Sequence, residues 1–215
     1  MKNTRKRELC IIKPKRIKRG DKVAIVSLSW GGLGDDTLIH KYSIAKNRLE
    51  NEFGFVVTCM PHALKGIELI AKNPQLRAQD LMDAFQDPSV CAIFCSIGGD
   101  DTIRTLPYIN LDIIRNHPKI FMGYSDTTIH HFMLHKAGLV SFYGPSILCE
   151  FGEYVNRITN YITANSLLNG HKSLNRFDVN IKANMIFAGE KGDRFPCFLI
   201  CWHSLSFYPC SAISF

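Results

Sequence analysis

Two short stretches of the sequence place glycine, serine and aspartate directly after apolar runs that are typical of buried strands. They are Ser-Ile-Gly-Gly-Asp-Asp at 96–101 and Gly-Tyr-Ser-Asp at 123–126. In a parallel sheet, the carboxyl ends of the strands deliver functional groups to one edge. Gly123 allows a bend where a side chain would clash, which leaves Ser125 at the tip of the turn with its hydroxyl clear of the backbone. We interpret Ser125 as a nucleophile.

Asp126 follows Ser125 at the predicted entrance of a helix. An acidic residue suits the unpaired N–H groups and the positive end of the helix dipole there. The same N–H groups could bind an oxyanion. The alternative is that Ser125 or Asp126 only caps the helix, and from residue types alone capping is the commoner role.

The elements that must position these residues alternate between strand and helix patterns. Strands are predicted at 22–29, 55–59, 90–95 and 120–122, with a short strand and turn at 141–145. Helices are predicted at 37–53, from Asn73-Pro74 to Asp87-Pro88, after Ser125, and at 155–168. The alternation predicts an α/β fold, with a parallel sheet, helices on both faces and a Rossmann-like amino-terminal domain.

Charge is distributed unevenly along the 215 residues. Residues 1–19 carry nine Lys or Arg and one Glu, whereas the rest of the chain has 17 basic and 18 acidic groups. The net charge of +7 therefore belongs to a basic leader, which we expect to be poorly ordered. No nucleic-acid motif follows it, so no nucleic-acid partner is expected. The 46% of hydrophobic residues is typical of a globular protein.

Four segments follow from composition. A basic leader covers 1–19, a nucleophile domain covers 20–168, a linker or start of a carboxyl-terminal domain covers 169–194, and an aberrant apolar tail covers 195–215. The tail has no Lys, Arg, Asp or Glu, and its two prolines leave too few residues for a membrane span. Such a shift in composition suggests a truncated chain, for example after a frameshift. No signal peptide is recognisable, so we expect a cytoplasmic protein without a membrane partner.

Other candidate sites are weaker. His131 and His135 are four residues apart, as in zinc sites, but the acidic partner of that motif is missing, and packing or capping roles are favoured. The spacing of Cys91 and Cys95 does not fit a zinc knuckle. The glycine-rich stretch 30–36 matches no nucleotide-binding fingerprint, and we interpret it as a substrate-facing loop or a connector. No metal and no cofactor are predicted.

Several motifs together resemble the LD-carboxypeptidase family of serine peptidases, including its microcin C immunity (MccF-like) branch. In order along the chain, they are Gly-Gly-Asp-Asp at 98–101, Leu-Pro-Tyr-Ile at 106–109, Gly-Tyr-Ser-Asp at 123–126, Gly-Leu at 138–139 and Tyr-Gly-Pro at 143–145. The similarity covers residues 20 to about 165. It implies that Ser125 is the nucleophile and that the backbone N–H groups of Gly99 and Asp126 form the oxyanion hole.

The resemblance also implies a reaction. Members hydrolyse an amide bond beside a free carboxylate, either the bond before the terminal D-alanine of a murein tetrapeptide or a bond in a peptidyl nucleotide antibiotic. They use a Ser-Glu-His triad without a metal, and the Glu and His come from a carboxyl-terminal domain. Glu190 and His203 are only nominal candidates, because neither lies in a segment that resembles the family's motifs.

Two functions therefore remain open at this point. The first is a serine carboxypeptidase that is catalytically impaired in this chain, because a serine without its base is a poor nucleophile. The second is a noncatalytic module that binds a peptide or a nucleotide. The expected partner is a small peptide or peptidyl-nucleotide substrate in either case, and a homodimer is left open.

Overall fold

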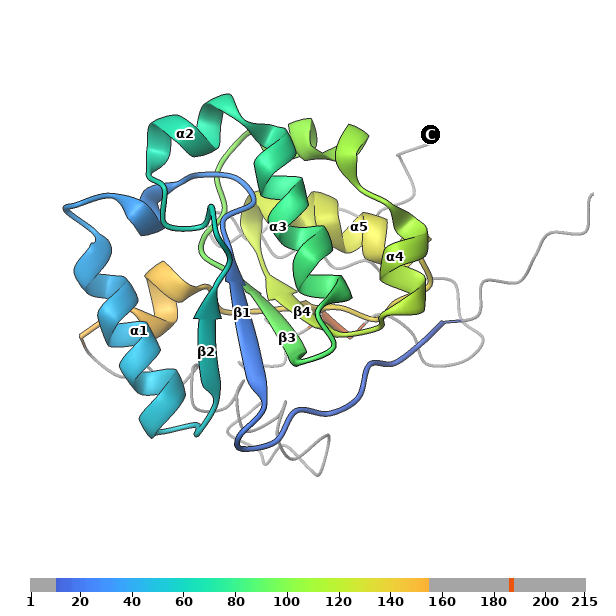
Figure 1. Ribbon diagram of the computed structural model, residues 1–215, viewed down its shortest axis with the longest axis horizontal. Helices are drawn as coiled ribbons and strands as arrows, with labels where there is room; N and C mark the ends of the chain where they lie inside the picture. The colour runs from blue at the N-terminus through green and yellow to red at the C-terminus, as the bar shows by residue number, and fades with distance from the viewer. Residues whose placement is uncertain (1–10, 155–185, 188–215) are drawn as a thin grey trace, which may run out of the picture.

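A single sheet lies at the centre of the computed structural model, which describes residues 11–154 and 186–187 (Figure 1). Its strand order is β2-β1-β3-β4-β5-β6. The first five strands are parallel, and β6 pairs with β5 in the antiparallel direction. The strands are β1 (Lys22–Val26), β2 (Val56–Cys59), β3 (Val90–Cys95), β4 (Ile120–Gly123), β5 (Phe142–Tyr143) and β6 (Ile186–Phe187).

Helices cover both faces of this sheet, which confirms the predicted α/β class. Figure 1 shows α1 beside the orange segment η4 and, on the other side of the sheet, α3, α4 and α5. The helices are α1 (Ile39–Asn51), α2 (Ile67–Lys72), α3 (Pro74–Gln86), α4 (Leu111–Asn116) and α5 (Thr128–Lys136). Shorter 3₁₀ turns are η1 (Gly32–Gly34), η2 (Thr102–Tyr108) and η3 (Ser125–Thr127), and η4 (Ile147–Phe151) is a π-helix.

The alternation of side chains along β1 explains why the strand is apolar throughout. Val23 and Ile25 belong to the core cluster on the α1 face, whereas Ala24 and Val26 belong to the cluster on the α3 face. All four side chains are fully buried. A parallel strand that is covered on both faces needs a continuous apolar run, and this is the pattern from which the strand was predicted.

Strand β1 ends at Val26, three residues before the end of the predicted strand at residue 29. The next residues are buried but polar. Ser27 Oγ donates to the carbonyl oxygen of Ala63, at 2.9 Å, and lies 2.9 Å from Ser96 Oγ. The Ser27 hydroxyl is thus hydrogen bonded to loops at the carboxyl edge of the sheet. The regular strand pairing of β1 ends at this point.

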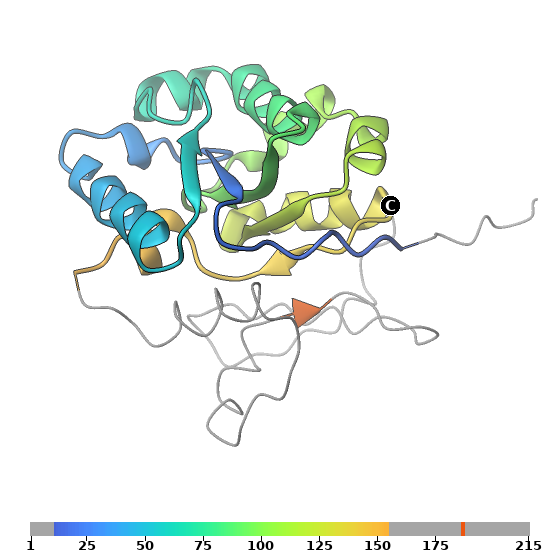
Figure 2. The same cartoon turned by 60° about the horizontal axis from the view of Figure 1, so that its bottom comes forward.

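Part of the basic leader is ordered, which corrects the expectation for residues 12–17. Ile12 forms a bridge with Leu139, and Ile17 is 1% exposed within the core. The Ile12 N–H donates to the carbonyl of Gly138. Figure 2 shows the segment in dark blue as it leads into β1. The apolar residues between the lysines and arginines give this segment a face that packs on the domain. Residues 1–10 lie outside the described part of the chain.

Helix boundaries differ from the predictions in small ways. Asn73 precedes α3, as predicted, but its side chain does not cap that helix. Instead its amide donates to the carbonyl of Leu69, near the end of α2, a helix that the sequence pattern did not predict. The helix predicted at 155–168 and most of the segments 169–194 and 195–215 lie outside the described residues.

Candidate active site

The carboxyl ends of β3 and β4 bring the two glycine- and serine-containing turns together. Gly98 follows β3 and Ser125 follows β4, and the two strands are direct neighbours. A Cβ atom added to Gly98 would lie 2.7 Å from Ser125 Cβ and 2.8 Å from Ser125 Oγ. Only a glycine allows this approach, so the Gly-Gly loop forms one wall beside the Ser125 hydroxyl.

Ser125 has an unusual backbone conformation. Its φ is +61°, and no other non-glycine residue has a positive φ in the part of the chain that the structure describes. A left-handed conformation costs a residue with a side chain about 1–2 kcal/mol, and such strain often occurs at functional sites. The residue is exposed, and its hydroxyl makes no hydrogen bond to any described residue.

Neighbouring groups fix the backbone of Ser125 on both sides. Its N–H donates to the phenol oxygen of Tyr143, at 3.1 Å, and its carbonyl accepts a hydrogen bond from the Thr128 hydroxyl. Helix α5 begins at Thr128, and no side chain caps its amino terminus. The capping alternative for Ser125 and Asp126 is therefore not what the structure shows.

Gly123 contributes space rather than an unusual torsion. A Cβ atom there would lie 2.7 Å from Cys95 Sγ and 2.7 Å from Thr127 Oγ1, which confirms the predicted clash. Its φ is not among the positive values. The strained torsion of the turn is instead at Ser125 itself.

The carboxylate of Asp126 binds the loops that follow β1 and β3. Its Oδ2 accepts hydrogen bonds from Ser29 Oγ, at 2.5 Å, and from the N–H of Thr102, at 2.8 Å. From the sequence, the Asp126 side chain was expected only to favour or cap the helix that follows it, and this contact with two distant loops was not predicted. No local pattern could have shown it, because Ser29 is 97 residues away along the chain.

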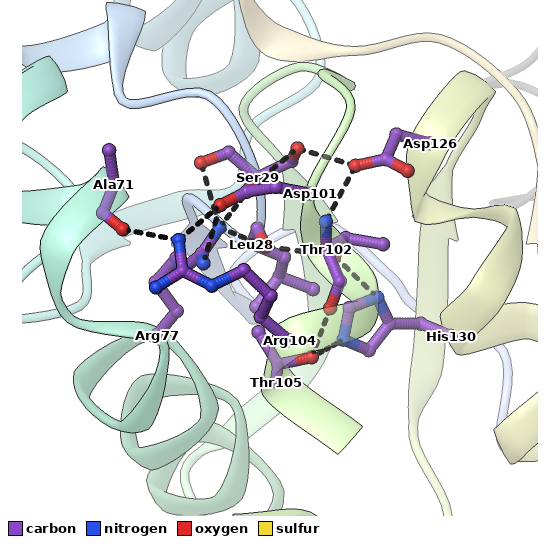
Figure 3. A network of polar contacts seen from close by, with 10 residues as sticks. All are labelled: Leu28, Ser29, Ala71, Arg77, Asp101, Thr102, Arg104, Thr105, Asp126 and His130. Atoms are coloured by element: carbon purple, nitrogen blue, oxygen red, sulfur yellow. Dashed lines mark hydrogen bonds and ion pairs between the residues drawn. The ribbon is translucent and has the colours of Figure 1, made fainter. Parts of the chain in front are cut away.

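Arg77 is the buried centre of a polar network beneath these loops (Figure 3). Its guanidinium donates to the carbonyls of Leu28 and Ser29, at 3.2 Å each, and to both carboxylate oxygens of Asp101. Arg104 binds the same carboxylate from the exposed side. Burial acts to raise the pKa of Asp101, but the hydrogen bonds and charges of the two arginines outweigh it and hold that pKa below 3.8.

The histidines of α5 pack and bind hydroxyl groups. His130 lies between the hydroxyls of Thr102 and Thr105, and burial lowers its pKa to about 3. His131 lies between Ser141 Oγ and the carbonyl of Gly123; burial lowers its pKa to about 4, against the opposing effect of the Gly123 hydrogen bond. Both rings are neutral near pH 7. Neither is hydrogen bonded to Ser125, in agreement with the expected packing role.

Other site types find no support among the residues that the structure describes. No group of three or more His, Cys, Asp or Glu residues there could hold a metal ion. Within the same ranges, none of the helices has the length and apolar character required to cross a membrane. Glu190 and His203 lie outside the described residues.

Comparison with known proteins identifies relatives of this arrangement. The family model of the LD-carboxypeptidase N-terminal domain (Peptidase_S66) matches residues 23–144, which is more than half of the chain. A probable murein peptide carboxypeptidase of Bacillus subtilis is 36% identical over 142 residues, which are 65% of this chain and 42% of that protein. The microcin C7 self-immunity protein MccF of Escherichia coli is 40% identical over 79 residues, which are 36% of this chain and 23% of that protein.

Solved structures agree with the sequence relatives. An MccF-like protein from Streptococcus pneumoniae, in complex with AMP, is 39% identical with a TM-score of 0.65, over 72% of this chain and 46% of that one. MccF in complex with aspartyl sulfamoyl adenosine is 26% identical with a TM-score of 0.63, over 75% and 47% of the two chains. The chain thus spans less than half the length of the relatives that it matches.

Proposed function

Because the chain belongs to the LD-carboxypeptidase family, we propose that Ser125 is the nucleophile of a serine carboxypeptidase reaction. The single observation that carries this proposal is the conformation of Ser125. It is an exposed serine with a φ of +61° at the carboxyl end of a central strand, and its hydroxyl is free of hydrogen bonds within the described residues. A strained turn that presents a serine in this way is typical of nucleophiles.

In this reaction, Ser125 Oγ attacks the carbonyl carbon of an amide bond and its proton passes to a base. The carbonyl oxygen becomes an oxyanion, which accepts hydrogen bonds from the N–H groups of Gly99 and Asp126. Two observations support these donors. The Gly99 N–H makes no hydrogen bond within the described residues, and the Asp126 N–H lies beside Ser125, where a Cβ on Gly98 would be 3.2 Å from its nitrogen.

The substrate is an amide beside a free carboxylate. The family resemblance implies two chemical classes, a murein peptide that ends in D-alanine and a peptidyl nucleotide. The relatives named as a murein peptide carboxypeptidase and as a microcin C7 self-immunity protein fit these two classes. A family member needs no metal or cofactor for this chemistry, since the nucleophile, the oxyanion hole and a Glu-His pair supply it.

The described residues supply neither a base for Ser125 nor the carboxylate that would orient that base. No histidine among the described residues is hydrogen bonded to Ser125, and both His130 and His131 have other partners. Loss of a triad member costs several orders of magnitude in rate. The 215-residue chain by itself is therefore expected to be catalytically impaired.

The test compares two proteins on two substrates. One is the 215-residue chain, and the other is a chimera in which residues 1–154 are joined to the carboxyl-terminal half of the MccF-like protein of Streptococcus pneumoniae. Release of D-alanine from a murein tetrapeptide and cleavage of an aminoacyl sulfamoyl adenosine are measured for both. Turnover by the chimera and at most trace turnover by the chain support the proposal. Binding of either substrate by the chimera without any turnover would instead favour the noncatalytic module.

A further inference from the structure

The side chain and the backbone of Asp126 face different parts of the site. The backbone N–H lies at the turn beside Ser125, where a Cβ on Gly98 would approach it to 3.2 Å. The carboxylate, in contrast, binds Ser29 Oγ and the N–H of Thr102 (Figure 3). We call these two hydrogen bonds the Asp126 bridge. The chemical step proposed for Ser125 does not use them.

We propose that the Asp126 bridge is a positioning device that sets the Gly98–Gly99 loop at the correct distance from Ser125. This inference rests on the proposed function, because it assigns the Gly99 N–H to the oxyanion hole. Asp126 would then act twice, through its own N–H as a donor and through its carboxylate as the group that positions the other donor.

The bridge joins the ends of three strands. Asp126 follows β4, Ser29 follows β1, and Thr102 ends the loop that leaves β3. The same Ser29 hydroxyl lies directly against the loop, because a Cβ on Gly99 would be 2.1 Å from Ser29 Oγ. The hydroxyl therefore touches the loop at Gly99 and the nucleophile turn at Asp126.

The loop also has other polar contacts, which include the ion pair of Asp101 with Arg77, the contact of Thr102 with His130, and two hydrogen bonds to the end of β1. The N–H of Trp30 donates to the carbonyl of Gly98, at 3.2 Å, and the Thr102 hydroxyl donates to the carbonyl of Leu28, at 2.8 Å. Both contacts tie the loop to β1, and neither ties it to β4. Hydrogen bonds to a carboxylate are about twice as strong as neutral ones, so the Asp126 bridge is the strong link between the loop and Ser125.

The geometry of an oxyanion hole makes such a link functionally important. The donors must lie about 2.7–3.1 Å from the position that the oxyanion will occupy. A displacement of about 1 Å can lower a reaction rate about a hundredfold. Without the Asp126 bridge, the hydrogen bond that remains between the loop and the segment after β4 is the neutral one between Thr102 and His130, and the loop could move relative to β4 by that amount.

The first measurement is hydrogen exchange in the amides of residues 98–102, followed by mass spectrometry on the 215-residue chain. Asp126→Ala should accelerate this exchange at least tenfold. Ser29→Ala, which removes one of the two hydrogen bonds, should have a smaller effect. Asp126→Asn should fall between the wild type and Asp126→Ala, since the amide oxygen can accept both hydrogen bonds but lacks the charge that strengthens them. The matched control is Asp112→Ala on α4, where the carboxylate pairs with Arg115 at the surface.

The second measurement is the affinity of the same variants for N-acetyl-1-aminoethylboronic acid, followed by boron NMR. Boron adds the serine oxygen, the serine proton is released, and a tetrahedral anion that resembles the reaction intermediate forms. The adduct should be absent in Ser125→Ala, at least tenfold weaker in Asp126→Ala, and partly restored in Asp126→Asn. If Asp126→Ala only disturbed folding, the recovery of boronic acid affinity in Asp126→Asn would not follow the recovery of slow exchange in the same variant.

The outcomes separate the two proposals. The positioning role would be overturned if the amides of residues 98–102 in Asp126→Ala exchanged at the wild-type rate. It would also be overturned if Asp126→Ala bound the boronic acid with the wild-type affinity. An adduct that persists in Ser125→Ala would overturn the role of Ser125, while the exchange rates would still decide whether the bridge fixes the loop.

Discussion

Gly98 and Ser125 are in direct contact across neighbouring strands, because a Cβ at Gly98 would approach Ser125 Oγ to 2.8 Å. The contact is between backbone and side chain, so neither residue can gain volume without moving the other. It places the hydroxyl beside the loop that carries the N–H of Gly99. The position of the proposed nucleophile therefore depends on a residue that has no side chain.

The first prediction concerns Gly98→Ala. The new methyl group should displace Ser125 and destabilise the protein by about 1–3 kcal/mol, the usual cost of overpacking. It should also abolish the Ser125-dependent boronic acid adduct. Urea unfolding and boron NMR measure the two effects.

Gly20→Ala is the control for that variant. A Cβ at Gly20 meets nothing within 4 Å, although its φ of +91° makes any side chain unfavourable there. This control should lose stability through its backbone and keep the adduct. An unchanged adduct in Gly98→Ala would show that the contact does not position Ser125.

The second prediction concerns the strain at Ser125. A glycine adopts a φ of +61° without the steric cost that an alanine pays. Ser125→Gly should therefore be more stable than Ser125→Ala by about 1 kcal/mol. The order should reverse at Ser43, an exposed residue of α1, where glycine costs about 1 kcal/mol relative to alanine. Urea unfolding of the four variants provides the comparison, and the same order at both positions would contradict the strained turn.

The third prediction concerns pH and the buried histidines. Burial lowers the pKa of His130 to about 3 and that of His131 to about 4, from 6.5. Between pH 6.5 and 4, the unfolded chain binds protons that the folded protein does not bind, so the free energy of unfolding should fall as the pH falls. The slope is up to about 1.4 kcal/mol per pH unit for each histidine.

His130→Asn and His131→Asn should each flatten that slope, even where they lower stability at pH 7. Urea unfolding at pH 7, 6 and 5 measures the slope for the three proteins. Equal slopes in the wild type and in both variants would show that these histidines become protonated in the folded state.

The strand pattern could be predicted well from sequence. The run at 90–95 agrees with β3 at both ends, and the end of the run at 120–122 is one residue from the end of β4. Both strands are buried on two faces, so their residues are continuously apolar and are bounded by polar turns. The neighbouring position of the two turns follows from the parallel order.

The supporting network could not be predicted from local patterns. Arg77 is 49 residues from Leu28, and Asp126 is 24 residues from Thr102. The sequence held one indication of this network. Arg77 lies on the same face of its helix as the apolar residues Leu81 and Phe85, which indicates that its side chain is buried. A lone arginine on such a face needs a buried partner, and a search for that partner among the acidic residues near the turns would have included Asp101.

The role of Ser125 is tested most directly by the effect of Ser125→Ala on hydrolysis by the chimera that carries residues 1–154 and a relative's carboxyl-terminal half. We predict that D-alanine release from a murein tetrapeptide falls by at least a thousandfold, because the nucleophile is lost. We also predict that stability stays within about 0.5 kcal/mol of the parent or rises, since an exposed hydroxyl contributes little to the core. Turnover near the parent rate in Ser125→Ala would contradict the assignment of Ser125 as the nucleophile.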